Sequence, residues 1–369
     1  PPADDAAPLL TGGEGLGFGE APAATDLSVL EPVLPALADA FGRARRSDRV
    51  LAGFAEHGVA TEYLALSTGL RLRHVQPTGA FHLVGRSTDG ARSAWVGAAT
   101  ADFTDIDVAS LEARINERLG WAGRAVALPA GRYEVILHPE AVADLMVGLV
   151  DAAGGQDAED GRSVFSAPDG RTKVGEQLSS LPFELRSDPE EPGLECAPFL
   201  VCTASGPDTS VFDNGMPLER TAWVEDGRLN RLQYHRAGAQ RSGVPATPPI
   251  DNLVLQLPGA QASLQDMVRS TERGLLLTCL WYIREVDPTT LLLTGLTRDG
   301  VYLVEDGKVT GGVNNFRFNE SPVDLLRRAT EAGASHRALG REFGEWLNRS
   351  SMPPLRIPDF NMSSVSQAS

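Results

Sequence analysis

Cysteine is scarce in this 369-residue chain, and long apolar runs and basic residues are also few. The three cysteines, Cys196, Cys202 and Cys279, form no C-x-x-C pair and are too few for a disulfide framework. The longest apolar run lies around residues 274–283 and is much shorter than the about 20 residues that a membrane-spanning helix needs. We therefore expect a cytoplasmic protein with no membrane segment.

The shortage of basic residues bears on possible partners. The chain has 33 Lys and Arg residues against 49 Asp and Glu residues, which gives a formal net charge of −16. Binding along a nucleic-acid backbone needs clustered Lys and Arg, so we expect no nucleic-acid partner. Hydrophobic residues make up 42% and charged residues 22% of the chain, which is the composition of a folded globular protein.

The first third of the chain mixes helical and strand patterns. Residues 1–25 are rich in Pro, Gly and Ala and indicate a loop, and apolar residues at helical spacing follow from Leu27 to about Glu56. Segments 63–68, 69–74 and 80–85 are typical of neighbouring antiparallel strands separated by Gly and Pro, and residues 107–120 return to helical spacing. These patterns predict an N-terminal α+β domain over residues 1–127.

The rest of the chain is richer in strands. Residues 133–137 predict a buried strand, and a helix with Pro139 in its first turn follows over residues 139–149. Residues 200–312 are mostly strand-like, with hairpin turns expected at 213–215, 225–227 and 305–307. Within them we expect a helix that Ser263 caps and Gly274 ends. A helix over 322–333 and an extended tail over 350–369 complete a larger, β-rich C-terminal domain over residues 128–369, so the predicted fold class is α+β.

Several segments of this second domain resemble one known family. They are GRYEVIL at 131–137, SVFDNG at 210–215, TPPIDNLVL at 247–255, ERGLLLTCLWYIREVDP at 272–288, GVYLVEDG at 300–307, NNFRFNESP at 314–322 and PDFNMSSVSQAS at 358–369. In content and order they resemble the TldD/PmbA family, also called modulator of DNA gyrase proteins. The resemblance is to the non-catalytic, TldE/PmbA-like branch of that family, in its actinobacterial type.

The resemblance implies both an assembly and an activity. Family members form a heterodimeric metallopeptidase in which a TldD-like catalytic subunit holds zinc and cleaves or trims small, unfolded peptides inside an enclosed cavity. We therefore expect this chain to be the partner subunit, with a TldD-like protein and a peptide substrate as its binding partners. Family members also carry a further N-terminal segment, so we expect the N-terminal domain of this chain to be truncated at its start.

One helix decides between the two branches of the family. In the catalytic subunit, the helix after the strand at 131–137 carries His-Glu-x-x-x-His, and a distal Cys completes the zinc site. The matching positions here are Pro139, Glu140 and Asp144, and the C-terminal tail has no Cys. Proline has no side-chain donor atom, and His138 stands one position too early. The resemblance therefore implies no catalytic residue, metal or cofactor on this chain, and zinc on the partner.

Two other functions stay open at this point. His138, Glu140 and Asp144 form a rearranged metal site if the chain is an independent metallopeptidase. Alternatively, the chain is a non-enzymatic regulator that binds proteins, as the older family name suggests. A first-turn Glu after a strand-end His is also an ordinary helix start, because acidic residues are favoured there by the helix dipole.

A second candidate region precedes the helix predicted at 322–333. It contains Asn314, Asn315, Arg317, Asn319 and Glu320, interleaved with two phenylalanines. A strand would turn both Phe rings to one side and Arg317 with Asn315 and Asn319 to the other. These polar residues then form either an internal hydrogen-bond network or a contact with substrate or partner. The tail after Asp359 is polar, and we expect it to pack on this chain's core or on the partner.

Overall fold

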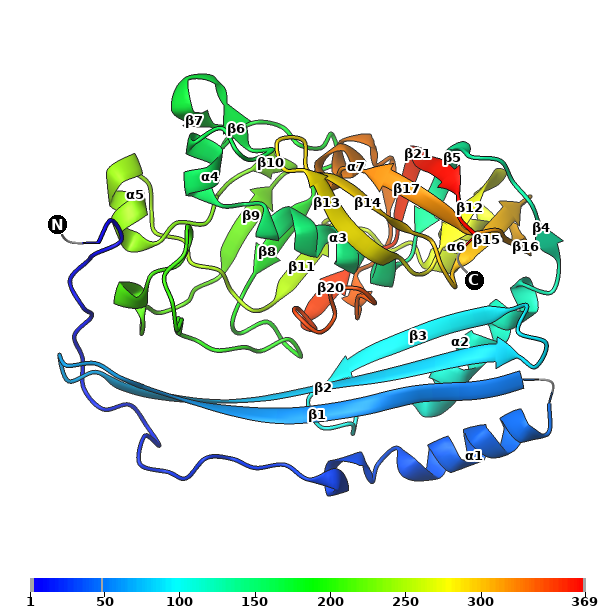
Figure 1. The fold of residues 1–369 in the computed structure, drawn as a ribbon, viewed down its shortest axis with the longest axis horizontal. Helices are drawn as coiled ribbons and strands as arrows, with labels where there is room; N and C mark the ends of the chain where they lie inside the picture. The colour runs from blue at the N-terminus through cyan, green and yellow to red at the C-terminus, as the bar shows by residue number, and fades with distance from the viewer. Residues whose placement is uncertain (1–2, 48, 368–369) are drawn as a thin grey trace.

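A computed structural model describes residues 3–47 and 49–367 of the chain. Its first part consists of an N-terminal segment, helices and three strands. These are the 3₁₀ turn η1 (Leu27–Leu30), α1 (Leu34–Arg45), β1 (Arg49–Ala65), β2 (Arg71–Ser87), β3 (Ser93–Thr100) and α2 (Val108–Trp121). The strands form an antiparallel sheet in the order β1-β2-β3. Figure 1 shows this sheet crossing the molecule between α1, which lies beneath it in the view, and the C-terminal part above.

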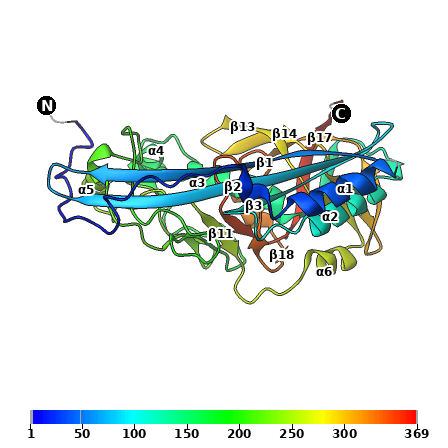
Figure 2. The same ribbon diagram turned by 90° about the horizontal axis from the view of Figure 1, so that it is seen from below.

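Both helices cover one face of this sheet. Seen from below, α1 and α2 lie together across its outer face (Figure 2). Leu51 and Phe81 from the strands pack there against Ala40 of α1 and Ile115 of α2. Strand side chains alternate between faces, so Trp95 and Gly97 of β3 are turned to the opposite face, toward the C-terminal part.

The strands are longer than the sequence patterns predict. The predicted segment 63–68 contains the end of β1 and the turn that follows it. The predicted segments 69–74 and 80–85 belong to the single strand β2, which begins at Arg71. Pro77 suggests a break, but β2 tolerates it. The odd-numbered residues of β2 direct their N–H groups toward β3. Since β3 ends at Thr100, opposite Gly79, Pro77 lies beyond the last pair of these two strands, and its missing N–H removes no hydrogen bond between them.

The helix predicted from Leu27 to about Glu56 is wrong at its C-terminal end. The observed helix α1 ends at Arg45, and residues from Arg49 onward pair with β2 instead. Gly53 and Gly58 weaken helix propensity in this stretch, and pairing with a neighbouring strand decides its conformation. The predicted loop over 1–25 has no helix or long strand in its described part; Pro1 and Pro2 lie outside the described residues.

The C-terminal part contains two larger sheets. The six-stranded sheet has the order β10-β9-β8-β11-β20-β19, and the ten-stranded sheet has the order β13-β14-β17-β21-β5-β12-β15-β16-β4, with β18 paired to β21. The strands of the six-stranded sheet are β8 (Glu184–Ser187), β9 (Thr221–Glu225), β10 (Arg228–Leu229), β11 (Leu253–Gln256), β19 (His336–Arg337) and β20 (Ser350–Met352). Those of the ten-stranded sheet are β4 (Ala125–Val126), β5 (Gly131–Leu137), β12 (Arg273–Leu277), β13 (Trp281–Asp287), β14 (Leu292–Leu296), β15 (Val301–Glu305), β16 (Lys308–Val313), β17 (Phe316–Glu320), β18 (Glu331–Ala332) and β21 (Leu355–Val365).

Short helices and turns complete this part. They are α3 (Pro139–Asp151), α4 (Gly155–Glu159), η2 (Pro168–Gly170) between β6 (Ser166–Ala167) and β7 (Arg171–Thr172), η3 (Val211–Asp213), α5 (Arg236–Ser242), α6 (Leu264–Arg269) and α7 (Pro322–Arg328). The largest hydrophobic cluster joins Leu145 of α3 to Leu185 and Leu255 of one sheet and to Leu277 and Phe316 of the other. The fold is thus mixed and β-rich, as predicted.

Three predicted details of this part are wrong. Gly274 does not end a helix, because α6 stops at Arg269 and Gly274 pairs with Val304 in the ten-stranded sheet. The helix from Pro322 ends at Arg328, and β18 follows it. Residues 213–215 form no hairpin: Asn214 uses its side chain to bond both the N–H and the C=O of Cys202. The hairpin turns at 225–227 and 305–307 are confirmed.

The tail is an internal strand. β21 lies between β17 and β5 in the ten-stranded sheet, and Ile357, Phe360 and Met362 are fully buried. The tail therefore packs on this chain's own core, while Ala368 and Ser369 lie outside the described residues. Across residues 3–47 and 49–367, no helix has the length and apolar character that crossing a bilayer requires.

The division at residues 127 and 128 stays a prediction. One hydrophobic cluster contains residues from Val33 to Leu119, and the largest cluster begins at Val135. Strand β4, which precedes the predicted boundary, pairs with β16 of the ten-stranded sheet.

Candidate functional site

The first turn of α3 holds the positions that match the family motif. His138 is the N-cap of the helix, and its Nδ1 accepts a hydrogen bond of 3.3 Å from the backbone N–H of Glu140. Pro139 follows at the first helical position, where its missing N–H loses nothing. The strand and helix predicted here from local patterns are confirmed.

Glu140 is buried against two arginines from α2. Arg114 forms an ion pair with Oε1, and Nη2 of Arg118 lies 3.3 Å from Oε2. Arg118 also donates to the carbonyl oxygen of Trp95 on β3. Burial opposes ionisation of Glu140, but the neighbouring His138 and the two guanidinium groups together outweigh it and lower its pKa below the usual value. Glu140 therefore stays an anion and ties α3 to α2.

His138 is neutral near physiological pH. Burial, together with the nearby charge of Arg118 and Arg114, lowers the pKa of His138 to about 3, although Glu140 acts in the opposite direction. The 3.4 Å contact between Nδ1 and Oε2 of Glu140 is therefore no ion pair. His138 is a capping residue that accepts a backbone hydrogen bond.

Asp144 anchors a distant loop. Its carboxylate is fully buried and accepts backbone N–H bonds from Arg341 at 3.0 Å, Glu342 at 3.1 Å and Phe343 at 3.0 Å. Burial raises the pKa of Asp144 to about 7 against the effect of these donors. The preceding Gly340 has to be glycine, because an added Cβ would lie 2.3 Å from Asp144 Oδ1.

The anchored loop in turn joins the two parts of the molecule. The guanidinium of Arg341 lies 3.8 Å from the ring centroid of Trp281 and 5.6 Å from that of Trp95 on β3. It donates to Asp299 at 2.8 Å, and Asp299 also accepts from Ser93 of β3. Asp144 therefore positions a side chain that bridges the N-terminal sheet and the ten-stranded sheet.

A cavity of about 450 Å³ opens beside the first turn of α3. Its wall contains His138 to Glu140, Arg114 of α2, Gly97 to Ala99 of β3 and residues 336–339 at β19. A second cavity of about 220 Å³ shares Ala99, Asp105, Arg337 and Asn348 with the first. Arg337 stands at this junction, since it pairs with Asp105 at 2.7 Å and donates to the carbonyl oxygen of Ala99 at 2.9 Å.

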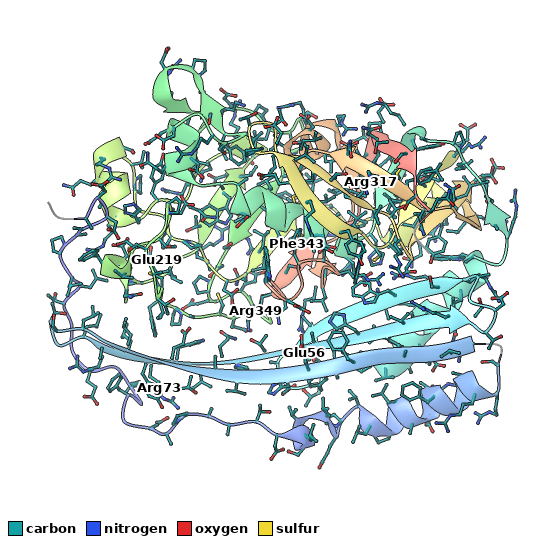
Figure 3. The ribbon with its side chains drawn as sticks, viewed as in Figure 1. Glu56, Arg73, Glu219, Arg317, Phe343 and Arg349 are labelled. Carbon is teal, nitrogen blue, oxygen red and sulfur yellow. The ribbon has the colours of Figure 1, made fainter. Side chains whose placement is uncertain are left out.

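The second predicted region lies elsewhere. Asn314 accepts from the N–H of Leu128 at 2.7 Å and, with Asn315, lines a separate cavity of about 500 Å³. Arg317 is exposed. Figure 3 shows it near the top of the view, far from the N-terminal sheet, which Arg349 approaches. The predicted alternation is confirmed, because Phe316 and Phe318 are fully buried on one side of β17.

Asn319 and Glu320 make contacts within the ten-stranded sheet. Asn319 Oδ1 accepts from Thr294 of β14 at 2.8 Å. Glu320 is buried, pairs with Arg328 and accepts from the N–H of Asn361 on β21 at 2.6 Å. A role of the five residues in substrate or partner contact stays a prediction.

The possible metal ligands and the cysteine thiols were two further candidates for chemistry. In residues 3–47 and 49–367, no three or more His, Cys, Asp and Glu side chains come together in a group that could hold a metal ion. Burial raises the pKa of Cys279 to about 12 and that of Cys196 to about 11, so neither thiol is activated.

Sequence patterns did not reveal several residues of this site. Arg114 and Arg118 stand four residues apart on one side of α2, and Asn348, Arg337 and Arg341 come from the C-terminal quarter. A pair of arginines at this spacing was the only local signal. Its partner Glu140 is 26 residues from Arg114, and nothing in the sequence between them indicates the contact.

The C-terminal part of the chain matches a known family. A family model described as the PmbA/TldA metallopeptidase C-terminal domain matches residues 130–364. A search of curated proteins gives no match.

Solved structures match nearly the whole chain. A structure of TldE from Thermococcus kodakarensis aligns with a TM-score of 0.76 at 19% identity, over 98% of this chain and 80% of that one. A putative modulator of a DNA gyrase from Thermotoga maritima gives 0.72 at 17% identity, over 96% and 79% of the two chains. Another from Bacteroides thetaiotaomicron gives 0.67 at 18% identity, over 93% and 76%. At these identities the likeness shows the fold.

Proposed function

Because the chain belongs to the PmbA/TldD family, we propose that it is the metal-free partner subunit of a two-chain zinc peptidase. In this proposal a TldD-like subunit holds the zinc ion and cleaves small, unfolded peptides. This chain contributes part of the enclosing wall and stabilises the catalytic subunit.

The observation that carries the proposal is the state of Asp144. It stands where catalytic relatives have the second zinc-binding His, and three backbone N–H groups of residues 341–343 bind its two oxygens. A carboxylate that is already satisfied in this way has little left to offer a cation. Moving it to a metal would release the loop that holds Arg341 between the two parts of the molecule.

The other two motif residues, Pro139 at the first ligand position and Glu140 at the general-base position, supply no zinc ligand either. Pro139 has no donor atom, and Glu140 is held by two guanidinium groups whose charge repels a divalent cation. Catalytic zinc is usually bound by three protein ligands, with His, Cys, Asp and Glu as the donors. The side chains present at the motif therefore do not fit a zinc ion, and no catalytic step is assigned to them.

A reconstitution assay tests the proposal. We expect the purified chain alone to leave short unstructured peptides intact and expect cleavage when a TldD-like subunit is added. In the mixture, Glu140→Gln should not abolish the chemical step, because the catalytic Glu belongs to the other subunit. Cleavage by this chain alone that is lost in Glu140→Gln would instead support an independent peptidase built on His138, Glu140 and Asp144.

A further inference from the structure

The cluster of Arg114, Arg118 and Glu140 beside the cavity carries one more positive than negative charge, and Arg114 and Glu140 line the cavity. Among the described residues, the ion pairs of Arg114 and Arg118 involve a single carboxylate, that of Glu140. The adjacent His138 is neutral, so it adds no charge. The side chain of Arg118 is 3% exposed and that of Arg114 is 34% exposed. An anionic ligand beside Arg114 would balance the second guanidinium charge, which Glu140 alone does not neutralise.

A buried amide also faces this space. Asn348 is only 9% exposed and lines both cavities. No hydrogen bond joins its side-chain amide to another of the described residues. The donor group and the acceptor group of this amide match those of a peptide unit.

The edge of β3 supplies a third polar element. Arg118 donates to the carbonyl oxygen of Trp95, and Arg337 donates to that of Ala99. In an antiparallel ladder alternate residues point their backbone groups to the same side, so Gly97 between them also directs its N–H and C=O away from β2. Gly97 lines the cavity, where an extended chain can reach this edge.

We propose that this cavity binds the C-terminal end of an extended peptide, with the terminal carboxylate at Arg114 and peptide groups at Asn348 and Gly97. The peptide class rests on the proposed function, whereas the anchoring chemistry rests on the cavity itself. Its volume of about 450 Å³ is sufficient for a small ligand, since such sites commonly span about 300–1,000 Å³. An acidic side chain offers the same carboxylate chemistry as a chain terminus.

Binding of labelled peptides to the purified chain alone tests this proposal. Three peptides of the same neutral sequence carry a fluorophore at the N-terminus and end in a free acid, end in an amide, or end in an amide with one internal Glu. Fluorescence polarisation should show the free acid binding about tenfold or more tighter than the plain amide, as expected for a charge-assisted hydrogen bond. Equal affinity of acid and amide would overturn the proposal. Tight binding of the internal-Glu amide alone would contradict the terminal assignment.

Variants locate the carboxylate. Arg114→Ala should remove the preference for the free acid, and it leaves Glu140 paired with Arg118. Arg114→Lys keeps the charge and should retain most of the preference. The matched control is Arg43→Ala, because Arg43 and Arg49 share the buried carboxylate of Glu112 in the same way, away from this cavity. An unchanged preference in Arg114→Ala, or its loss in Arg43→Ala, would contradict the assignment.

A further variant separates main-chain binding from charge. Asn348→Ala should weaken the acid and the amide by the same factor, so the preference between them stays. Thermal unfolding of each variant checks that it is folded. No catalytic subunit is present in these measurements, so a chain that restores peptidase activity but shows no acid preference would refute this inference and leave the proposed function standing.

Discussion

Two buried glutamates in this molecule are each bound by two arginines, and they serve different regions. Glu112 of α2 pairs with Arg43 of α1 and Arg49 of β1, both at 2.5 Å. Glu140 of α3 pairs with Arg114 and Arg118 of α2. The two carboxylate side chains are 5% and 4% exposed, so their burial is nearly equal.

The surroundings of the two clusters differ. The Glu112 cluster joins α1, β1 and α2 within the N-terminal part, and its Arg43 side chain is 45% exposed. The Glu140 cluster joins α2 to α3, and Arg114 and Glu140 line the cavity of about 450 Å³. The same set of charges therefore holds elements together in one place and is a potential ligand site where it borders a cavity.

Removal of each glutamate should produce the largest losses of stability, and the two losses should differ. Glu140→Ala leaves Arg118, at 3% exposure, without its counter-ion, so we expect the free energy of unfolding to fall by about 3–5 kcal/mol. Glu112→Ala should cause a smaller loss of about 1–3 kcal/mol, since the more exposed arginine can turn to solvent. Urea unfolding of both variants gives the two values. A larger loss for Glu112→Ala would reverse the ranking.

Asp144 extends the comparison to a buried carboxylate that binds backbone N–H groups instead of arginines. Asp144→Asn replaces one acceptor oxygen by an NH₂ group that faces backbone N–H donors of residues 341–343. We expect a loss of about 1–3 kcal/mol in unfolding free energy, measured in the same urea experiment. Stability equal to that of the wild type would contradict the anchoring role.

The pH dependence should distinguish Asp144 from Glu140. The pKa of Asp144 is raised to about 7, so the folded protein holds this proton more tightly than the unfolded chain does. Its contribution to stability is present below the unfolded pKa and is lost as the pH rises through about 7. Wild-type stability relative to Asp144→Asn should therefore decrease as the pH rises from about 4 to about 7 and change little above that.

For Glu140 the sign is opposite. Its lowered pKa gives a contribution that is present above the unfolded pKa and is lost as the pH falls toward the folded one. Stability of the wild type relative to Glu140→Gln should thus decrease on acidification below the usual pKa of a glutamate. Parallel slopes for the two comparisons over the whole pH range would show that the assignment of directions is wrong.

The smallest effects are expected when one arginine is removed from each cluster. Arg114→Ala and Arg43→Ala each leave one arginine for one glutamate, so both proteins should unfold close to the wild-type temperature. The two variants should then differ in peptide binding alone. A marked thermal destabilisation of Arg114→Ala would show that this arginine is needed for the fold.

The sequence allowed prediction of elements set by local patterns. The strand before Pro139, the start of α3, α2 and the alternation of Phe316 and Phe318 were all predictable, because caps and periodicity act over a few residues. The length of β1 and β2 was not, since pairing along the hairpin overrides the glycines and Pro77.

The candidate site was predictable only in part. The family motif led to Pro139, Glu140 and Asp144, and these residues lie at the first turns of α3. Their partners were out of reach: Arg341 is 197 residues from Asp144, and such a contact arises only when the sheets assemble. The position of the tail inside the ten-stranded sheet was likewise a consequence of assembly.

Metal content tests the central claim most directly. The purified chain is incubated with zinc, passed through a desalting column and analysed for bound metal, with a TldD-like subunit treated in parallel as the positive control. The account predicts far less than one zinc per chain here and about one zinc in the control, in line with a complete ligand set. One zinc per chain that is lost on Asp144→Ala or His138→Ala would contradict it.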